Sequence, residues 1–338
     1  MSLPADAYYP LAPNLKICRI LNGMWQVAGS HGAIDPQTAI AEMFQYVDAG
    51  FGSWDLADEY GPAEDWLGEF RQQWIATRSP DAESFQALTR WVPRPGRMTR
   101  KVVEYCVNVS RKRMNTPVID LMQFHWWDYH DLNYLDALKH LADLQAEGVI
   151  KQIGLTNFDT TRLEIIVEAG IPIVSNQVQF SVLDRRPLKR MTDFCQANKI
   201  ALLCYGSMAG GLFSKHLIGE PEPGRMRLNT ASLRKYKQMI DEWGDWKLFQ
   251  ELLLTLQSIA YKHHVSVPNV AVRYILEQPA VAGVIIGTRL GRAEHVAENS
   301  RVFDFQLDAQ DYDRLDEIQS RSVNLFETIG DCGDEYRY

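Results

Sequence analysis

The feature that most constrains the fold is a regular alternation of short apolar runs with amphipathic segments. Helical periodicity recurs between most of the runs, at 38–48, 99–113, 132–147, 160–168, 188–197 and 246–263. The apolar runs have the length of strands and lie at 17–21, 52–55, 85–88, 118–124, 150–154, 173–176, 200–205 and 281–286. They lack the alternation of half-exposed strands, which is typical of parallel strands buried on both faces. The sequence therefore predicts an α/β fold, a closed (β/α)8 TIM barrel.

The chain length agrees with a single barrel domain that spans residues 1–338 and carries additions. One addition is the segment 210–245, which is too long for an ordinary loop and follows the seventh apolar run. We expect this insertion to lie over the mouth of the barrel, where the loops after the strands gather. A last helix is expected at 308–319, and an acidic tail at 327–338. The alternative is a doubly wound sheet, which requires an early glycine-rich turn, and the sequence has no GxGxxG motif.

The composition of the chain argues against some classes of binding partner. Lysine and arginine number 35 against 43 acidic residues, a formal net charge of −8, which argues against a nucleic-acid-binding protein. No apolar run approaches the roughly 20 residues of a membrane span, and the N-terminus shows no secretory signal pattern. The five cysteines are widely spaced without a CxxC pair, and we interpret them as reduced thiols. We therefore expect a cytoplasmic protein that acts on a small molecule, and no pattern specifies its oligomeric state.

Polar and aromatic residues follow the predicted strands at the ends that meet at the mouth of a barrel. In chain order they are Trp25, Asp55, Tyr60, Arg90, His125, Asn157, Gln177 and Tyr205. This set suits carbonyl reduction, because a tyrosine beside a cation can protonate a developing alkoxide and an imidazole can orient the carbonyl oxygen. Amide side chains can hold a carboxamide, and an aromatic ring can stack on a flat heterocycle.

Hydrolytic and metal-dependent chemistry fit the sequence less well. There is no nucleophile elbow and no HxH or HExxH motif. The segment 125–131 contains histidines and aspartates, but it straddles a strand end and a loop, whereas metal ligands converge from rigid elements. No metal site is predicted.

Several motifs occur in a characteristic order. The segment GFGSWDLADEYG at 50–61 places Asp55 five residues before Tyr60. It is followed by LMQFHW at 121–126, IGLTNF at 153–158, NQ at 176–177, CYGS at 204–207, IGTR at 286–289 and EN at 298–299. Over most of the chain, from residue 16 to residue 318, this series resembles the aldo-keto reductase superfamily. The resemblance implies a (β/α)8 barrel that binds NADP(H) across its carboxyl-end mouth without a Rossmann domain.

The resemblance also implies residue roles. The catalytic set is Asp55, Tyr60, Arg90 and His125. The residues implied in cofactor binding are Gly23, Met24, Trp25, Thr156, Asn157, Gln177, Tyr205, Gly206, Ser207, Met208, Gly210, Gly287, Thr288, Arg289, Glu298 and Asn299. The substrate pocket is expected to be lined by Trp25, Trp126 and Trp127. The implied reaction is NADP(H)-dependent reduction of a small aldehyde, ketone or sugar carbonyl, or oxidation of the alcohol, with Tyr60 as general acid and base.

One residue departs from the family pattern. The third predicted strand ends in Thr89-Arg90-Trp91, where the family has a lysine that pairs with the aspartate and lowers the pKa of the tyrosine. Arginine keeps the positive charge and can pair bidentately with Asp55, but its fork is larger and flatter than an ammonium. Two hypotheses follow, an active aldo-keto reductase and a catalytically weak NADP(H)-binding regulatory module. The two hypotheses depend on whether the arginine still forms the hydrogen bond to Tyr60.

Overall fold

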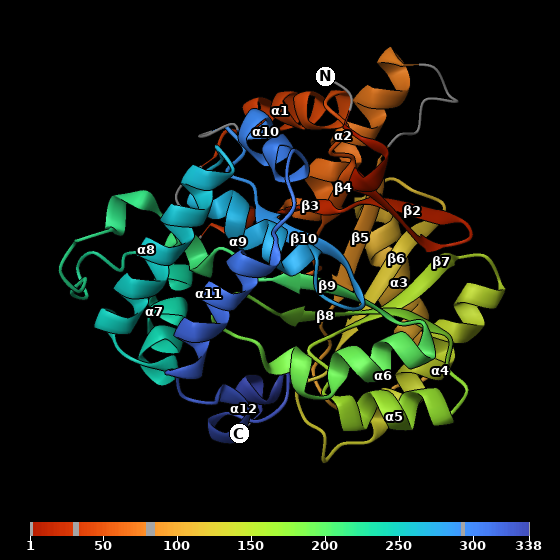
Figure 1. Ribbon diagram of the computed structural model, residues 1–338. Helices are drawn as coiled ribbons and strands as arrows, with labels where there is room; N and C mark the ends of the chain where they lie inside the picture. The colour runs from red at the N-terminus through yellow and green to blue at the C-terminus, as the bar shows by residue number, and fades with distance from the viewer. Residues whose placement is uncertain (1–2, 30–33, 79–84, 292–294, 338) are drawn as a thin grey trace.

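The structure is a computed structural model that describes residues 3–29, 34–78, 85–291 and 295–337 (Figure 1). Within these ranges, eight parallel strands close a barrel in the order β10-β3-β4-β5-β6-β7-β8-β9. They are β3 (Ile20–Gly23), β4 (Ser53–Asp55), β5 (Gln86–Trp91), β6 (Ile119–His125), β7 (Ile150–Thr156), β8 (Ile173–Gln179), β9 (Ala201–Tyr205) and β10 (Val281–Gly287). The predicted TIM barrel is confirmed.

Helices surround the barrel and alternate with its strands. They are α1 (Pro36–Asp48), α2 (Ala63–Thr77), α3 (Arg100–Arg113), α4 (Asn133–Ala146), α5 (Thr160–Glu168), α6 (Met191–Asn198), α8 (Trp246–Lys262) and α9 (Val267–Leu276). Side chains just before a helix fix where it begins. The carboxylate of Asp35 accepts a 2.8 Å hydrogen bond from the backbone N–H of Thr38, and Asp159 caps α5 in the same way.

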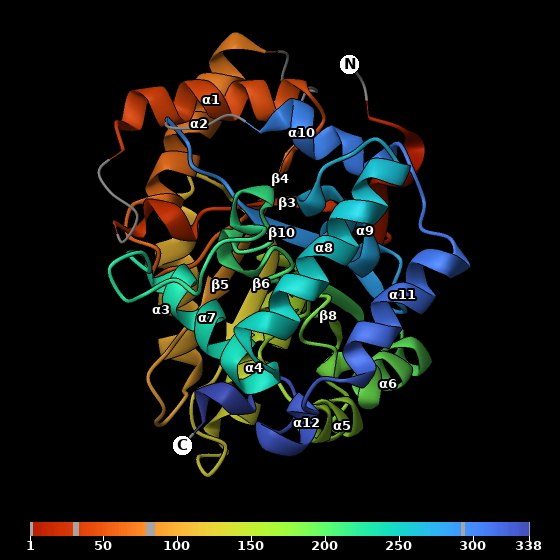
Figure 2. The same ribbon diagram turned by 60° about the vertical axis from the view of Figure 1, so that its left-hand side comes forward.

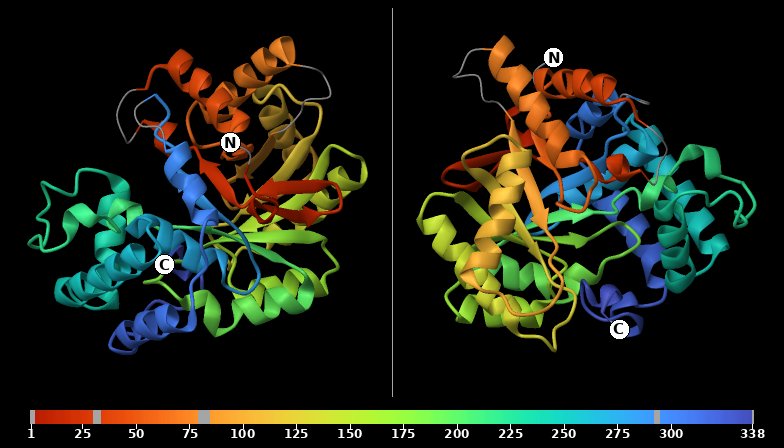
Figure 3. Two further views of the ribbon diagram at one scale, coloured as in Figure 1. Left: turned by 45° about the horizontal axis from the view of Figure 1, so that its top comes forward. Right: turned by 180° about the vertical axis from the view of Figure 1, so that it is seen from behind.

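The first apolar run differs from the prediction, because it divides between two structures. Its beginning belongs to β2 (Leu15–Cys18), which pairs antiparallel with β1 (Tyr8–Ala12) in an N-terminal hairpin. Only the end of the run enters the barrel, in β3. Leu15 and Ile17 of the hairpin join a buried cluster with Leu21, Leu121 and other inward-facing barrel residues. The hairpin (red in Figure 3) therefore packs on the barrel and covers apolar side chains at its amino end.

The predicted helical segments do not include three longer helices, α2, α7 and α9, or the short helices α10 (Val296–Ser300) and α12 (Leu325–Thr328). The helix α2 follows Pro62, which offers no side-chain cap. Most residues of α9 are buried, so the segment shows no polar face from which periodicity could be recognised. The helix α7 (Ala231–Trp243) lies inside the long segment 210–245, which we expected to be a loop. It runs beside α8 in two views of the molecule (Figures 1 and 2).

The C-terminal segment folds back over the barrel. After α11 (Ala309–Ser320), the chain forms α12 (Leu325–Thr328) and a last short turn, η7 (Asp334–Tyr336). The carboxylate of Asp331 accepts a 2.9 Å hydrogen bond from the backbone N–H at the start of α5. Glu335 accepts hydrogen bonds of 2.9 and 3.0 Å from the buried guanidinium of Arg186. Glu335 of the expected acidic tail is therefore ion-paired, and Asp331 is hydrogen-bonded, to residues of the barrel. In the described residues, no helix is long and apolar enough to cross a membrane.

Candidate active site

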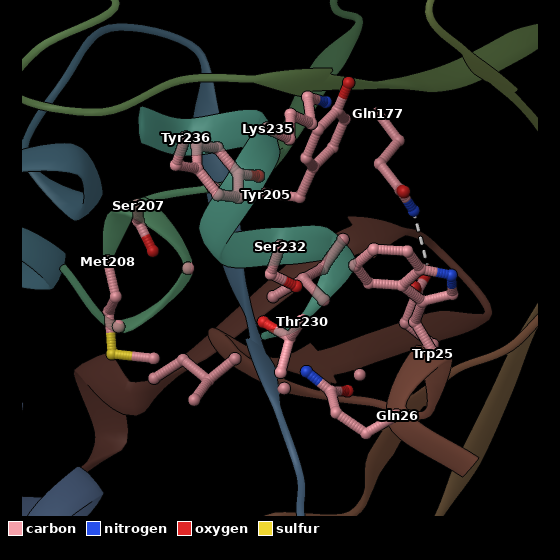
Figure 4. Close-up of a pocket in the computed structure, with 18 of the residues that line it drawn as sticks. Trp25, Gln26, Gln177, Tyr205, Ser207, Met208, Thr230, Ser232, Lys235 and Tyr236 are labelled. Atoms are coloured by element: carbon pink, nitrogen blue, oxygen red, sulfur yellow. Dashed lines mark hydrogen bonds between the residues drawn. The ribbon is translucent and has the colours of Figure 1, made fainter. Parts of the chain in front are cut away.

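A cavity of about 780 Å³ opens at the carboxyl ends of the strands (Figure 4). The barrel topology brings the strand-end residues to it, because parallel strands present their carboxyl ends at one edge. Asp55, His125 and Tyr205 are the last residues of their strands, and all three line the cavity. Tyr60, Arg90, Asn157 and Gln177 also line it. The eight strand-end residues identified in the sequence, Trp25 among them, therefore meet in one place.

Arg90 lies at the centre of the site and reaches three neighbours. Its Nη1 donates a 2.7 Å hydrogen bond to the phenol oxygen of Tyr60, and its Nε donates a 3.2 Å bond to Oγ1 of Thr156. Its Nη2 donates to the side-chain oxygen of Gln177. Burial lowers the pKa of Arg90, but Tyr60 and Asp55 outweigh burial and raise it, so the guanidinium stays charged.

Asp55 is held mainly by amides and not by a bidentate ion pair. Its Oδ2 is 3.7 Å from Nη2 of Arg90, whereas its Oδ1 accepts hydrogen bonds of 3.0 and 2.6 Å from Gln123 and Gln177. The expectation of a bidentate pair is therefore wrong, because the guanidinium directs its N–H groups to Tyr60, Thr156 and Gln177. Burial raises the pKa of Asp55 against the opposing effects of Arg90 and the two amides.

Tyr60 is a buried phenol beside a cation. Burial raises its pKa to about 12, an effect that Arg90 opposes and Asp55 reinforces. In the described part of the chain, no group accepts a hydrogen bond from its hydroxyl. Because the phenol oxygen accepts from Arg90, the phenol proton is free to face a ligand. At neutral pH Tyr60 is therefore a neutral phenol whose O–H is available to a ligand in the cavity.

His125 is a neutral imidazole at the mouth. Its Nδ1 lies 3.2 Å from the carbonyl oxygen of Thr156, and since a carbonyl only accepts, Nδ1 carries the proton. Burial, with Arg90 and Arg337, lowers the pKa of His125 to about 3. Its Nε2 is buried without a partner in the described residues. That atom is therefore an acceptor open to a hydroxyl group in the cavity.

The residues expected to hold a carboxamide are already arranged around this centre. Asn157 follows β7 in a left-handed conformation with φ of 58°, which asparagine tolerates better than most residues. Its Oδ1 accepts a 2.9 Å hydrogen bond from the hydroxyl of Tyr205. Gln177 points into the same region from β8 (Figure 4). The two amides and the ring of Tyr205 form one wall of the cavity.

Comparison with known proteins shows to which family the chain belongs. The model of the Aldo/keto reductase family matches residues 19–320. The chain belongs to this family. It is 25% identical over 328 residues to the aldo-keto reductase YhdN of Bacillus subtilis, an alignment that covers 92% of each protein. Family membership implies NAD(P)H-dependent carbonyl reduction.

Two further proteins are similar to the chain, one over part of its sequence and one in its fold. The chain is 30% identical over 177 residues to flagellar radial spoke protein 5 of Chlamydomonas reinhardtii; this alignment spans 47% of the chain and 33% of that protein. The solved structure of a glycerol dehydrogenase from Gluconobacter oxydans superposes with a TM-score of 0.76 at 18% identity. This superposition covers 95% of the chain and 97% of that structure, and it supports the fold.

Most of the residues expected to bind a cofactor in this aldo/keto reductase line the cavity. They are Gly23, Trp25, Thr156, Asn157, Gln177, Tyr205, Gly206, Ser207, Met208, Gly210, Gly287, Arg289, Glu298 and Asn299. After β9 the chain turns at Gly206 and Gly210, which have φ of 78° and 64°. A Cβ at Gly206 would lie 2.6 Å from the hydroxyl oxygen of Tyr236 and would displace that ring, and the positive φ also favours glycine here.

The hydroxyl of Ser207 indicates whether this turn suits a nicotinamide dinucleotide. Its side chain is 1% exposed, yet its Oγ has no hydrogen-bond partner in the described residues. A buried hydroxyl without a partner is costly unless a ligand satisfies it. A diphosphate supplies acceptor oxygens of the required kind. The residues present therefore fit the cofactor of the family.

Three expected residues do not line the cavity. Trp126 is fully buried, and its Nε1 donates to the carbonyl oxygens of Asp128 and Asp131 at 2.7 and 2.9 Å. Met24 is also fully buried in the core. Thr288 uses its Oγ1 to donate a 2.9 Å hydrogen bond to the carbonyl of Gly23, which ties β10 to β3. Trp127, in contrast, lines the cavity and contacts the ring of His125, with centroids 4.4 Å apart.

The long segment and the C-terminus bring to the cavity residues that the sequence does not predict there. From α7 come Lys235 and Tyr236, and from the C-terminal turn comes Tyr336. A signal for α7 existed, because Thr230 caps it with a 3.1 Å bond from the backbone N–H of Leu233. No signal existed for Tyr336, which reaches Tyr205 only because the chain folds back across the barrel.

Proposed function

We propose that this aldo/keto reductase reduces a small aldehyde, ketone or sugar carbonyl with NADPH, and oxidises the alcohol in the reverse direction. The proposal gives Tyr60 the role of general acid and base. It rests on one observation, the hydrogen bond from Nη1 of Arg90 to the phenol oxygen of Tyr60 inside the cavity. When bound, the nicotinamide supplies the hydride that the carbonyl carbon accepts. Tyr60 supplies the proton that the oxygen requires, and general acid catalysis of this kind typically contributes about 10²–10⁴-fold.

In the same proposal, His125 orients the reacting oxygen. Because its Nε2 is an acceptor, it is suited to receive the O–H of the alcohol and not to donate to the carbonyl. Arg90 and Asp55 hold Tyr60 in place, Arg90 by direct contact and Asp55 through Gln177. Asn157, Gln177 and the ring of Tyr205 would hold the carboxamide and the nicotinamide plane.

We also propose that NADP(H) is preferred over NAD(H). Arg289 is exposed and lines the cavity together with Glu298 and Asn299. A guanidinium there can pair with the 2′-phosphate that distinguishes the two cofactors. The free state of all five cysteines supports a cytoplasmic location, where thiols persist.

The experiment that tests the function combines turnover with binding. Oxidation of NADPH is followed with a panel of aldehydes, ketones and sugars, and NADPH affinity is measured by fluorescence titration. Turnover with at least one carbonyl compound, lost in Tyr60→Phe, supports the proposal. Absence of turnover at every pH, with NADPH still bound, contradicts it.

A second candidate is a cofactor-binding module with weak catalysis. Two observations favour it, the arginine in the place of the family lysine and the similarity to a protein named for a flagellar radial spoke. In that case NADPH would bind without turnover, and the bound state would change contacts with a partner. The experiment above separates the two candidates directly.

A further inference from the structure

Lys235 is a cation in the cavity surrounded by aromatic rings. It projects from α7, and Figure 4 shows it beside Tyr205. Its Nζ lies 5.1, 5.5 and 4.7 Å from the ring centroids of Tyr205, Tyr236 and Tyr336. It also donates a hydrogen bond to the hydroxyl of Tyr336. The rings hold the ammonium in place through cation–π contacts.

No carboxylate neutralises this lysine in the described ranges of the chain. Lys237, two residues later on the same helix, forms ion pairs with Glu222 and Asp241 at 2.6 and 2.5 Å. The ion pairs of the described residues include none for Lys235. Lys235 is half-buried and faces the cavity, so an anionic ligand could pair with its ammonium without displacing a carboxylate. The contrast between the two lysines marks Lys235 as a site for an anion.

The neighbouring acidic residue of the C-terminus is already engaged. Glu335 precedes Tyr336 and is bound by the buried guanidinium of Arg186, which also binds Asp184. Arg337 follows Tyr336 and donates a 3.0 Å hydrogen bond to the backbone oxygen of Trp126. The turn therefore brings the hydroxyl of Tyr336 to the cavity, while the carboxylate of Glu335 is held by Arg186.

Tyr336 links the cation to the reacting centre. Its hydroxyl is 3.0 Å from the hydroxyl of Tyr205, and its ring centroid is 6.4 Å from that of His125. One aromatic ring thus separates Lys235 from the imidazole expected to face the reacting oxygen. A compound with a carbonyl near His125 and an anionic group beyond it would reach both.

We propose that Lys235, with the hydroxyl of Tyr336, binds a carboxylate on the substrate, so that the enzyme prefers aldehydes or ketones that carry a carboxylate. This inference rests on the proposed function and names the substrate class of the same site. The ammonium donates to the carboxylate oxygens, and charge-assisted bonds of this kind are stronger than neutral ones. The O–H of Tyr336, which faces Tyr205 because Tyr205 donates its own proton to Asn157, joins the ammonium by turning toward the ligand.

The test compares substrates that differ only in charge. The pair is 4-carboxybenzaldehyde and methyl 4-formylbenzoate, assayed with NADPH on wild type, Lys235→Met, Lys235→Arg, Tyr336→Phe and the control Lys247→Met. Lys247 is exposed on α8, outside the cavity, and its loss changes the net charge equally. In Lys235→Met, the selectivity for the acid over the ester, measured as the ratio of kcat/KM values, is expected to fall roughly 10- to 100-fold through KM.

The other variants make the result specific. Lys235→Arg is expected to restore part of the selectivity, Tyr336→Phe to lose less of it than Lys235→Met, and Lys247→Met to keep it. Equal losses for acid and ester overturn the proposal. So does a rise in the NADPH dissociation constant as large as the rise in KM, which would place Lys235 at the cofactor.

A binding measurement separates this inference from the proposed function. Calorimetry with 4-methylbenzoate, which has a carboxylate and no reducible carbonyl, is carried out on wild type and Lys235→Met with NADP⁺ present and absent. If wild type reduces neither aldehyde, the proposed function fails, and weaker binding of 4-methylbenzoate to Lys235→Met still supports the anion site. Equal binding to both proteins, or binding to neither, overturns it.

Discussion

Nη1 of Arg90 donates a 2.7 Å hydrogen bond to the phenol oxygen of Tyr60. The arginine therefore keeps the contact between cation and tyrosine that a lysine makes elsewhere in the family. It also does more, because its remaining N–H groups bind Thr156 and Gln177. A single guanidinium thus connects the proposed proton donor to two residues expected to hold the carboxamide. A lysine ammonium is too compact to reach all of these groups at once.

Tyr60→Phe tests the proton donor. We expect reduction to fall about 10²–10⁴-fold, because phenylalanine keeps the ring and removes the only hydroxyl proposed as the acid. NADPH affinity and the melting temperature should stay close to wild type, since the ring still packs. Steady-state rates and a fluorescence titration check both. If the variant keeps more than a tenth of wild-type turnover, the acid must be a group other than Tyr60.

The barrel could be predicted because its signal is repeated. Eight apolar runs without alternation leave few other folds, and the order of motifs places Asp55, Tyr60 and His125 at one mouth whatever the loops do. The hairpin at the N-terminus could not be separated from β3, because only Arg19 stands between the apolar ends of β2 and β3.

The contacts around Arg90 and Tyr336 could not be predicted for a different reason. The sequence indicates that Arg90 ends a strand, but the direction of each N–H depends on side chains from β7 and β8. Those directions decide between a bidentate pair with Asp55 and the contacts observed. Tyr336 reaches the cavity because the hydrogen bonds between Glu335 and Arg186, which lie far apart in the sequence, hold the C-terminal turn in place.

Arg289→Ala tests the cofactor preference. Removal of a guanidinium that pairs with a phosphate is expected to weaken NADPH binding by roughly 10- to 150-fold and NADH binding far less. Titration of both cofactors against wild type and variant measures the difference. Equal dissociation constants for NADPH and NADH in wild type would show that Arg289 does not recognise the phosphate.

Ser207→Ala tests the turn proposed to hold the diphosphate. The Oγ of Ser207 has no partner in the described residues, so its removal should leave the melting temperature unchanged or higher while NADPH binds roughly tenfold more weakly. Ser175→Ala is the matched control, because Ser175 is buried in β8 with an equally unpartnered Oγ and does not line the cavity. Identical NADPH affinities in the two variants would place the diphosphate elsewhere.

His125→Gln tests the neutral imidazole through stability. The pKa of His125 is about 3 in the folded protein against an ordinary value of 6.5. Between these values the unfolded chain binds a proton that the folded chain does not, so the free energy of unfolding falls as the pH falls. From pH 7 to pH 5 this amounts to about 2 kcal/mol. Urea unfolding at both pH values should show that His125→Gln loses less stability than wild type by about this difference. Equal losses would mean that the folded imidazole titrates normally.

Arg90→Lys tests what the arginine does to the reverse reaction. Oxidation of an alcohol needs Tyr60 as a base, and with its pKa raised to about 12 by burial, little phenolate exists at neutral pH. In wild type we therefore expect oxidation to rise by about tenfold per pH unit from neutral toward alkaline pH, while reduction stays nearly flat. A lysine ammonium, free of Thr156 and Gln177, can direct its charge at the phenol oxygen and lower its pKa further. The variant should then oxidise alcohols faster at pH 7, with a pH profile displaced to lower values.

The control for this exchange is Arg289→Lys, which makes the same substitution elsewhere in the cavity and should leave the pH profile in place. Each unit by which Arg90→Lys moves the profile corresponds to about 1.4 kcal/mol of added phenolate stabilisation. A variant slower in both directions would contradict this account. It would mean that the bonds from Arg90 to Thr156 and Gln177 matter more than the charge beside Tyr60, because a lysine cannot replace them. Measurement of NADPH affinity in the same variant distinguishes the two causes, since loss of those bonds would disturb the carboxamide site as well as the rate.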